Sequence, residues 1–330
     1  MRRNIQIGIN VNTRAPIILK DYTVKDLVHL GERVEEAGYH SAWVGDSLVS
    51  KPRLEPLTTM AAIGSRTSKI KLGTSTLLLP LRNQFPPIFA QAWATLDVLT
   101  GGRTIFGIGV GGGHPRIEDK LEFEMCGVPY EQRGLRFEEG LEIVKLLWTQ
   151  DHVNFDGKYT KLTDVTLEPK PVQKPTPPIW IANAVRIFHV GPKTTERIFR
   201  RSARMADGIM SCCCSASEFQ EDFEKILEFR KEYKLDTTNF EPSHQVSLNI
   251  TDGEADQARE DMRTFLKRYY FIDYTDEQLA SWGPAGNAKK ILDWFDDFSS
   301  HRCRTFVVRL AGNDQEAQFK KFTAEVLPSL

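Results

Sequence analysis

The stretch from residue 70 to residue 110, IKLGTSTLLLPLRNQFPPIFAQAWATLDVLTGGRTIFGIGV, contains one complete strand–helix–strand unit. Residues 70–79 form an apolar run rich in Leu and Thr that predicts a strand ending before Pro80, and residues 89–99 predict a helix. Residues 104–110 predict the next strand. Strands that alternate with helices in this way indicate an α/β architecture with a parallel sheet.

The same alternation extends to both ends of the chain. Strands are predicted at residues 5–10, 41–45, 70–79, 104–110, 178–182, 207–211, 245–250 and 305–310, and helices at 24–37, 56–65, 89–99, 131–148, 193–205, 217–234, 255–271, 287–298 and 315–326. Gly38 is expected to end the first helix, and Ser217 to cap the helix at 217–234. Eight strand–helix units predict a (β/α)8 TIM barrel. An open doubly wound sheet is the alternative, but no Gly-rich fingerprint follows the first strand.

The length of 330 residues exceeds the roughly 250 residues of a minimal barrel. No linker or low-complexity segment divides the chain, so we expect a single domain over residues 1–330. The extra length predicts insertion segments over the carboxyl-terminal face of the barrel, near residues 114–130, 152–177 and 271–286.

Composition excludes several classes of function. Lys plus Arg number 43 and Asp plus Glu number 44, and the formal net charge is −1. There is therefore no basic footprint for nucleic acid and no polybasic patch for a membrane. No apolar run approaches the length of a membrane span, and the five cysteines lack the spacing of metal ligands or of a disulfide framework. These features predict a reduced, cytoplasmic protein without a metal site.

The ends of the predicted strands carry polar, mostly uncharged residues and many glycines, among them Asn10, Thr74, Asn183 and Arg309. The pattern contains neither a Ser-His-Asp arrangement nor a lysine placed to form a Schiff base. Such a ring suits a bulky bound cofactor that carries the reactivity itself. The glycine run at 107–113 could let a flat ring approach the backbone, or it could be a flexible strand-to-loop junction.

Other candidate residues have two readings each. Gly191 opens a helix whose free N–H groups could bind a phosphate with help from Lys193 or Thr194, but a Gly-Pro helix start is also common without a ligand. Arg133 and Arg136 could reach a phosphate at the barrel mouth, or pair with glutamates on their own helix. Asp46 could be a general acid or base, or could anchor a loop N–H group. Phe188, His189, Phe271 and Trp282 suggest an apolar lid, although single aromatic side chains more often pack in a core.

Several motifs resemble the bacterial-luciferase-like flavin-dependent oxidoreductases. They are EPLTTMAAIGSRT at 55–67, ATLDVLTGGR at 94–103 ahead of a Gly-rich strand, and GVPYEQRGLR at 127–136 ahead of the longest predicted helix. The resemblance covers nearly the whole chain and is strongest between about residues 38 and 208. It implies a TIM barrel, often a homodimer, with a flavin-type cofactor bound through its phosphate at the barrel mouth.

The resemblance also assigns residues. It implies a non-prolyl cis peptide at Ser75–Thr76 facing the flavin ring. We expect Thr74, Gly109 and Gly111 to contact the cofactor beside this bond. For the phosphate end it implies Arg136 together with the loop that contains Ala182 and Asn183. Gly191 and Lys193 are expected to add to that end. Asp46 is the candidate catalytic residue.

One departure from the family pattern bears on the chemistry. After the second strand the luciferases carry a histidine pair and deazaflavin-dependent relatives commonly carry Asp-His, whereas this chain has Asp46-Ser47. The acid is kept and the histidine is missing, which argues against the light-emitting reaction.

The first functional expectation is an enzyme, a two-component monooxygenase that uses reduced FMN and O2 on a small organic substrate. The flavin would come from a separate reductase, because no second nucleotide-binding domain is predicted. The first alternative keeps the fold and replaces FMN by a deazaflavin coenzyme that takes part in hydride transfer without oxygen. Alternatives of other classes are a barrel lyase or isomerase acting on a phosphorylated sugar, and a flavin-binding protein without turnover.

Overall fold

Eight parallel strands close into a barrel in the computed structural model, which describes residues 5–20, 22–82, 84–112 and 117–330. The strands are β1 (Gln6–Asn10), β2 (Ser41–Val44), β3 (Lys71–Thr74), β5 (Thr104–Gly109), β8 (Ile179–Asn183), β9 (Gly208–Cys212), β10 (Glu241–Ile250) and β12 (Thr305–Leu310). Closure comes from the pairing of β12 with β1, in which Thr305 lies opposite Gln6. The predicted (β/α)8 barrel is confirmed.

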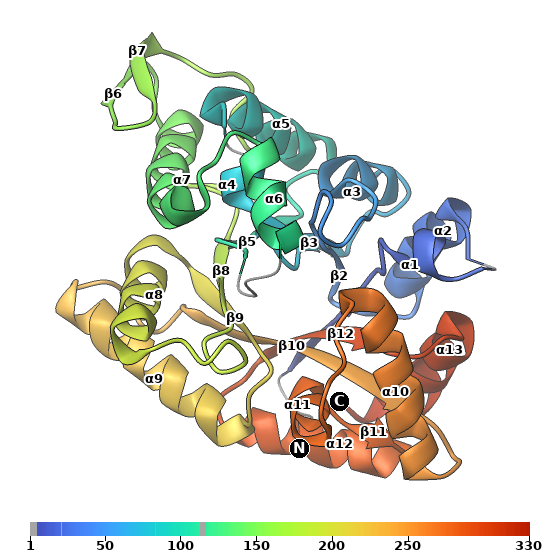
Figure 1. Cartoon of the computed structure of the whole chain (residues 1–330). Coiled ribbons are helices and arrows are strands. Elements are labelled where there is room, and N and C mark those ends of the chain that lie inside the picture. Colours follow the sequence, from blue (N-terminus) through green and yellow to red (C-terminus); the bar gives the residue numbers. More distant parts are fainter. Residues whose placement is uncertain (1–4, 21, 83, 113–116) are drawn as a thin grey trace.

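Helices surround the strands as an outer ring (Figure 1). They are α2 (Val24–Glu36), α3 (Pro56–Gly64), α5 (Pro86–Leu99), α7 (Arg133–Thr149), α8 (Pro192–Met205), α9 (Ala216–Glu232), α12 (Ala288–Ser300) and α13 (Gln315–Glu325). Gly38 follows α2 with φ of +79°, as its expected position after a helix end requires. The expected cap of α9 is wrong: Ser215, not Ser217, accepts the N–H of Glu218 and completes a capping box.

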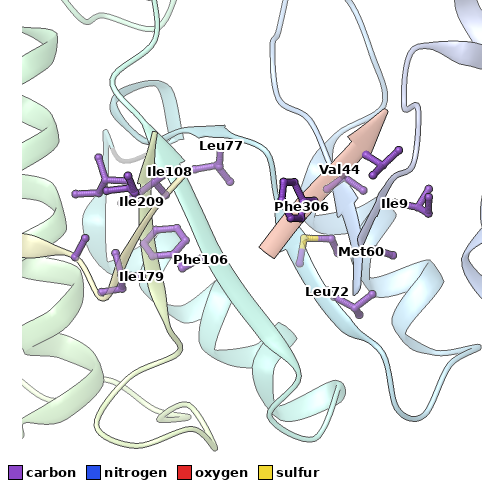
Figure 2. Close-up of a cluster of buried hydrophobic side chains, with 14 of the residues drawn as sticks. Ile9, Val44, Met60, Leu72, Leu77, Phe106, Ile108, Ile179, Ile209 and Phe306 are labelled. Carbon is purple, nitrogen blue, oxygen red and sulfur yellow. The ribbon is translucent and has the colours of Figure 1, made fainter. Parts of the chain in front are cut away.

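Alternation along the strands divides the buried side chains into two layers. Figure 2 shows residues of the outer layer, which pack between strands and helices, including Val44, Phe106, Ile179, Ile209 and Phe306. The residues adjacent to them in sequence form a separate cluster inside the barrel: Trp43, Ile105, Trp180, Met210 and Val307. The rings of Trp43 and Trp180 stack at 5.2 Å. The barrel interior is therefore a packed core, and any site must lie at one end of the strands.

Two of the expected insertions add structure at the carboxyl-terminal face. Residues 114–130 include α6 (Ile117–Met125), whose Phe123 packs against Leu81 and Val128. Residues 271–286 include α11 (Asp276–Trp282) and β11 (Ala285–Gly286), which pack with α10 (Ala255–Tyr270) in one hydrophobic cluster. Short helical turns complete the description: α1 (Ala15–Ile18), α4 (Leu79–Arg82), η1 (Tyr130–Gln132) and η2 (Leu327–Ser329).

The third insertion lies at the opposite face from the one expected. Residues 152–177 form an antiparallel hairpin of β6 (Val153–Asp156) and β7 (Lys161–Val165) beyond α7 (Figure 1). Gln173 then donates to Asp97 Oδ1 and to the carbonyl oxygen of Thr104, each at 2.8 Å, where β5 begins. The segment follows a helix rather than a strand, so it emerges at the amino-terminal ends of the strands. The expectation that it covers the carboxyl-terminal face is wrong.

No helix in the described part of the chain is both long enough and apolar enough to cross a membrane.

Candidate active site

A cavity of about 580 Å³ opens at the carboxyl-terminal ends of the strands. Its wall draws on segments from all around the barrel: the ends of β5, β8, β9 and β12, the loops after β2 and β3, and helices α6, α7, α8 and α11. This is the face at which TIM barrels carry their active sites. Of the residues predicted from the sequence, Asp46, Ser75, Thr76, Gly109, Gly111 and Ala182 line this cavity.

One wall of the cavity is made of backbone and small side chains. The peptide bond between Ser75 and Thr76 is cis, as the family resemblance implied. It separates β3 from the short strand β4 (Leu77–Leu78), so the single strand expected over residues 70–79 is interrupted. A Cβ placed on Gly109 would lie 3.0 Å from Thr76 Oγ1 and 3.4 Å from the Cβ of Ala182. These three residues therefore form a continuous surface on which a flat ring could lie.

Two neighbours of this wall differ in exposure. Thr74 is fully buried outside the cavity lining, where its hydroxyl donates to the carbonyl oxygen of Gly107 at 2.5 Å. Gly111 lines the cavity with φ of +75°, and a Cβ there would lie 2.9 Å from a methyl group of Leu78. A larger residue at 111 would be strained and would also clash. Gly113, at the end of the glycine run, lies outside the described residues.

Asp46 lines the cavity, but both of its carboxylate oxygens have partners. Oδ2 accepts the N–H of Leu78 at 3.0 Å and Arg82 Nε at 3.1 Å, and Oδ1 accepts a second Arg82 nitrogen at 2.6 Å. The side chain of Asp46 is fully buried in this pair. Burial lowers the pKa of Arg82, but its hydrogen bond and charge interaction with Asp46 outweigh burial, so that the pKa is raised. The geometry is that of an anchored ion pair beside the Ser75–Thr76 bond.

The loop after β2 is fixed by acidic residues of α6. Glu122 Oε2 accepts the hydroxyl of Ser47 at 2.7 Å and the backbone N–H groups of residues 48–50 at 2.6–3.0 Å. Asp119 pairs with Lys51 at 2.9 Å. Ser47 is thus a hydrogen-bond donor to a buried carboxylate.

The residues predicted for the phosphate end lie at or beyond the edge of the cavity. Arg136 is not in the lining: its guanidinium packs 4.4 Å from the ring centre of Tyr159. Asn183 is buried behind the wall and accepts the hydroxyl of Ser202 at 3.1 Å. Gly191 is exposed at the start of α8 and outside the lining, and Lys193 lines a second, adjoining pocket.

Three other arginines face this end of the cavity, namely Arg133 from α7 and Arg197 and Arg201 from α8. Arg133 lies 3.7 Å from the ring centre of Tyr130, and Arg201 Nε is 2.8 Å from Glu138 Oε1. Burial lowers the pKa of Arg133 and of Arg201, and the positive charge of Arg197 lowers both further. Guanidinium groups that repel one another across an open cavity form a favourable site for an anion such as a phosphate.

The far end of the cavity is aromatic with a buried cation. Tyr270 stacks on Trp282 at 4.8 Å, and Tyr274 meets Trp282 edge-on at 5.8 Å. Arg309 at the end of β12 is 2% exposed and donates to the hydroxyl of Tyr270 at 2.6 Å. Arg53 also lines this region.

A comparison with known families matches this architecture. The sequence model described as luciferase-like monooxygenase matches residues 5–301. The chain belongs to this family. The resemblance inferred from the motifs is thereby confirmed.

Curated relatives of this family member include F420-dependent glucose-6-phosphate dehydrogenases. The protein from Amycolatopsis mediterranei (strain U-32) is 26% identical, with 93% of this chain and 94% of the relative covered. The protein from Kribbella flavida (strain DSM 17836 / JCM 10339 / NBRC 14399) is also 26% identical, with the same coverage.

Solved structures of the same fold include both an F420-dependent dehydrogenase and a monooxygenase. An F420-dependent secondary alcohol dehydrogenase in complex with an F420-acetone adduct has a TM-score of 0.80 at 19% identity, covering 100% of this chain and 99% of its own. The monooxygenase RslO1 from Streptomyces bottropensis has a TM-score of 0.78 at 20% identity, covering 98% and 99%. At these identities the likeness establishes the fold.

Sequence reasoning left several cavity residues of this luciferase-like chain unassigned. Arg197 and Arg201 lie on a helix face that resembles an ordinary solvated surface. Tyr270 and Tyr274 lie in and after α10, which the sequence presents as one more helix of the outer ring. One feature of the sequence pointed to this part of the cavity: Arg309 is a charged residue at the carboxyl end of an otherwise apolar strand. Of the aromatic residues expected in a lid, Phe188 and Trp282 line the cavity, whereas Phe271 is 58% exposed.

Proposed function

We propose that this protein is a deazaflavin-dependent oxidoreductase that binds coenzyme F420 and transfers a hydride between it and a small organic substrate. An oxidoreductase activity follows from family membership, and the proposal concerns the cofactor and the reaction. Relatives similar along nearly the whole chain are named F420-dependent. They favour the deazaflavin alternative over the reduced-FMN monooxygenase that was expected first.

The residues of the cavity fit a deazaflavin. Thr76, Gly109 and Ala182 offer a flat surface, and the side chain of Asn10 supports Ser75 by donating to its hydroxyl oxygen at 2.5 Å. Arg133, Arg197 and Arg201 are positioned to hold a phosphate. When bound, a deazaflavin supplies or accepts a hydride at its ring. The role of the chain is to orient that ring and to keep water from it, because enclosure strengthens the electrostatic interactions inside the site.

The observation that carries the choice of F420 is a second pocket that continues from the first. It has a volume of about 460 Å³ and shares Glu138, Arg197 and Arg201 with the main cavity. Its lining contains five basic and two acidic side chains, with Lys193, Arg200 and Arg204 as the further cations. FMN ends at its phosphate, whereas F420 continues beyond its phosphate into an acidic tail of glutamates. A cationic groove that begins where the phosphate site ends matches the longer coenzyme.

Binding of F420 and of reduced FMN to the purified protein, measured side by side without oxygen, tests the proposal. We expect F420 to bind more tightly. Lys193→Gln should weaken F420 binding by about two- to fivefold and leave FMN binding unchanged, because a surface charge pair contributes up to about 1 kcal/mol. Arg133→Gln should weaken both cofactors by about tenfold or more, because it removes a charge-assisted phosphate contact.

Arg259→Gln is the matched control. Arg259 lies on α10, pairs with exposed Asp256 at 3.2 Å and is outside both pockets, so neither affinity should change. Tighter binding of reduced FMN would replace this proposal by the monooxygenase reading. Binding of neither cofactor would contradict both readings.

A further inference from the structure

The end of the cavity away from Arg133 contains a cluster of cations around one tyrosine ring. The guanidinium carbons of Arg309, Arg53 and Arg14 lie 4.4, 5.2 and 5.8 Å from the ring centre of Tyr269. Arg53 also donates to the hydroxyl of Tyr269 at 2.9 Å. Arg53 and Arg309 line the cavity. Because β12 stands across the barrel from β5 and β8, this cluster lies opposite the arginines of α7 and α8.

Arg53 and Arg309 have no carboxylate partner among the described residues. Three acidic residues of the cavity wall are paired elsewhere: Asp46 with Arg82, Asp119 with Lys51, and Glu138 with Arg201 and Arg204. A fourth, Glu131, lies in η1 at the other end of the cavity, where its charge acts on Arg133. Glu122 accepts hydrogen bonds from the loop after β2. Arg309 is 2% exposed, and its Nε has no hydrogen-bond partner in the part of the chain that the structure describes. A buried guanidinium without a counter-ion is costly, so the arrangement favours an anion from outside the protein.

The groups that surround Arg309 within the protein are weak acids or neutral. It donates to the hydroxyl of Tyr270 at 2.6 Å and to the side-chain oxygen of Gln245 at 2.7 Å, in the amide orientation that satisfies both partners. Burial raises the pKa of Tyr269, but Arg53, Arg309 and Arg14 outweigh burial and bring it below its ordinary value. The cluster thus polarises the phenol of Tyr269, and no carboxylate of the described residues pairs with Arg53 or Arg309. A carboxylate or phosphate would meet the two guanidinium groups with charge-assisted hydrogen bonds.

We propose that the substrate carries an oxyanion group, a carboxylate or a phosphate, and that Arg53 and Arg309 bind it. The identification of the bound molecule as a substrate rests on the proposed function. The anion site itself rests on Arg53 and Arg309, which have no carboxylate partner among the described residues. The stacked rings of Tyr270 and Trp282 would cover the rest of the molecule. With the cofactor phosphate at Arg133 and the substrate anion at Arg309, the reacting parts of both would meet near the Ser75–Thr76 bond.

The test uses inorganic phosphate and lactate as probes, titrated calorimetrically into the purified protein, with lactamide as the uncharged analogue. We expect the wild type to bind phosphate at two sites. Arg53→Gln should weaken one of them by about ten- to a hundredfold, since a hydrogen bond to a charged group is lost. Arg133→Gln should weaken the other. The anion whose affinity falls most in Arg53→Gln identifies the group as a phosphate or a carboxylate.

Two further variants keep the test decisive. Arg53→Lys retains the charge and should recover most of the affinity, and Arg309→Lys should lose severalfold because lysine lacks the forked donor. Arg259→Gln should leave both sites unchanged. Thermal unfolding checks that each variant is folded, and if Arg53→Gln is not, the two lysine variants carry the test.

The outcomes separate this inference from the proposed function. If neither probe loses affinity in Arg53→Gln or Arg309→Lys while F420 binds normally, the anion site is overturned and the proposed function stands. If F420 does not bind but Arg53→Gln still removes an anion site, the proposed function fails and the anion site stands. Equal binding of lactamide and lactate would exclude the carboxylate, and together with unchanged phosphate affinity in Arg53→Gln it would overturn the inference, because no anionic charge would then be recognised.

Discussion

Asp46 lies in the wall of the active-site cavity, but its contacts are those of a positioning residue rather than of a group that transfers protons. Both of its oxygens accept hydrogen bonds from Arg82, and Oδ2 also accepts the N–H of Leu78. Leu78 lines the cavity just after the Ser75–Thr76 bond. Replacing Asp46 by Asn should lower the free energy of unfolding by about 2–4 kcal/mol, because it leaves a half-buried guanidinium without its main partner. Urea denaturation of the two proteins measures this difference.

The double variant Asp46→Asn/Arg82→Gln is the control for that prediction. It removes both charges, so it should be more stable than Asp46→Asn alone, and turnover lost through displacement of Leu78 should partly return. A proton-transfer role would give another pattern. Asp46→Asn would then abolish turnover at unchanged stability, the pH–rate profile would lose one limb, and removal of Arg82 would restore nothing.

At the scale of one element, the start of α9 gives different roles to two serines that the sequence alone does not distinguish. Ser215 accepts the N–H of Glu218 and completes the capping box, whereas Ser217 is exposed within the first turn. Ser215→Ala should therefore lower the free energy of unfolding by about 1 kcal/mol. Ser217→Ala is the matched control and should change it by less than about 0.5 kcal/mol. Equal effects of the two substitutions in urea denaturation would refute the assignment of the cap.

The helix ends and the insertions show why some elements could be predicted and others could not. Apolar periodicity locates strands and helices because each buries one face. Gly38 marks a helix end because the backbone there has a φ of +79°, a conformation that favours glycine. The place of an insertion depends on what precedes it. Residues 152–177 follow a helix and therefore leave at the amino-terminal face, which their composition does not reveal.

At the scale of the molecule, the barrel could be predicted because closure needs only eight repeats of one local pattern. The site was harder to predict because it joins distant segments. Arg133, Arg197 and Arg309 come from α7, α8 and β12, and local sequence does not show which arginine of a helix faces the mouth. The neighbouring pair Arg133 and Arg136 shows this directly: the first lines the cavity and the second packs on Tyr159.

The barrel also buries a titratable group, which makes the stability of the whole molecule depend on pH. His244 in β10 is fully buried beside Phe219, Phe298 and Trp294, and burial lowers its pKa to about 3. In the unfolded chain a histidine titrates near its ordinary value of 6.5. Between these values the unfolded state binds more protons than the folded state. The stability contribution of neutral His244 is therefore complete above about pH 6.5 and is lost as the pH falls toward 3.

His244→Leu keeps a side chain of similar size and removes the titration. Urea denaturation at pH 7, 6, 5 and 4 should show that the wild type loses stability more steeply than the variant, by up to about 1.4 kcal/mol per pH unit below 6. The other histidines and the carboxylates are common to both proteins, so their contributions cancel in the difference. Parallel pH profiles would show that His244 takes up its proton in the folded barrel, which would require a polar partner for Nε2 that the described residues do not supply.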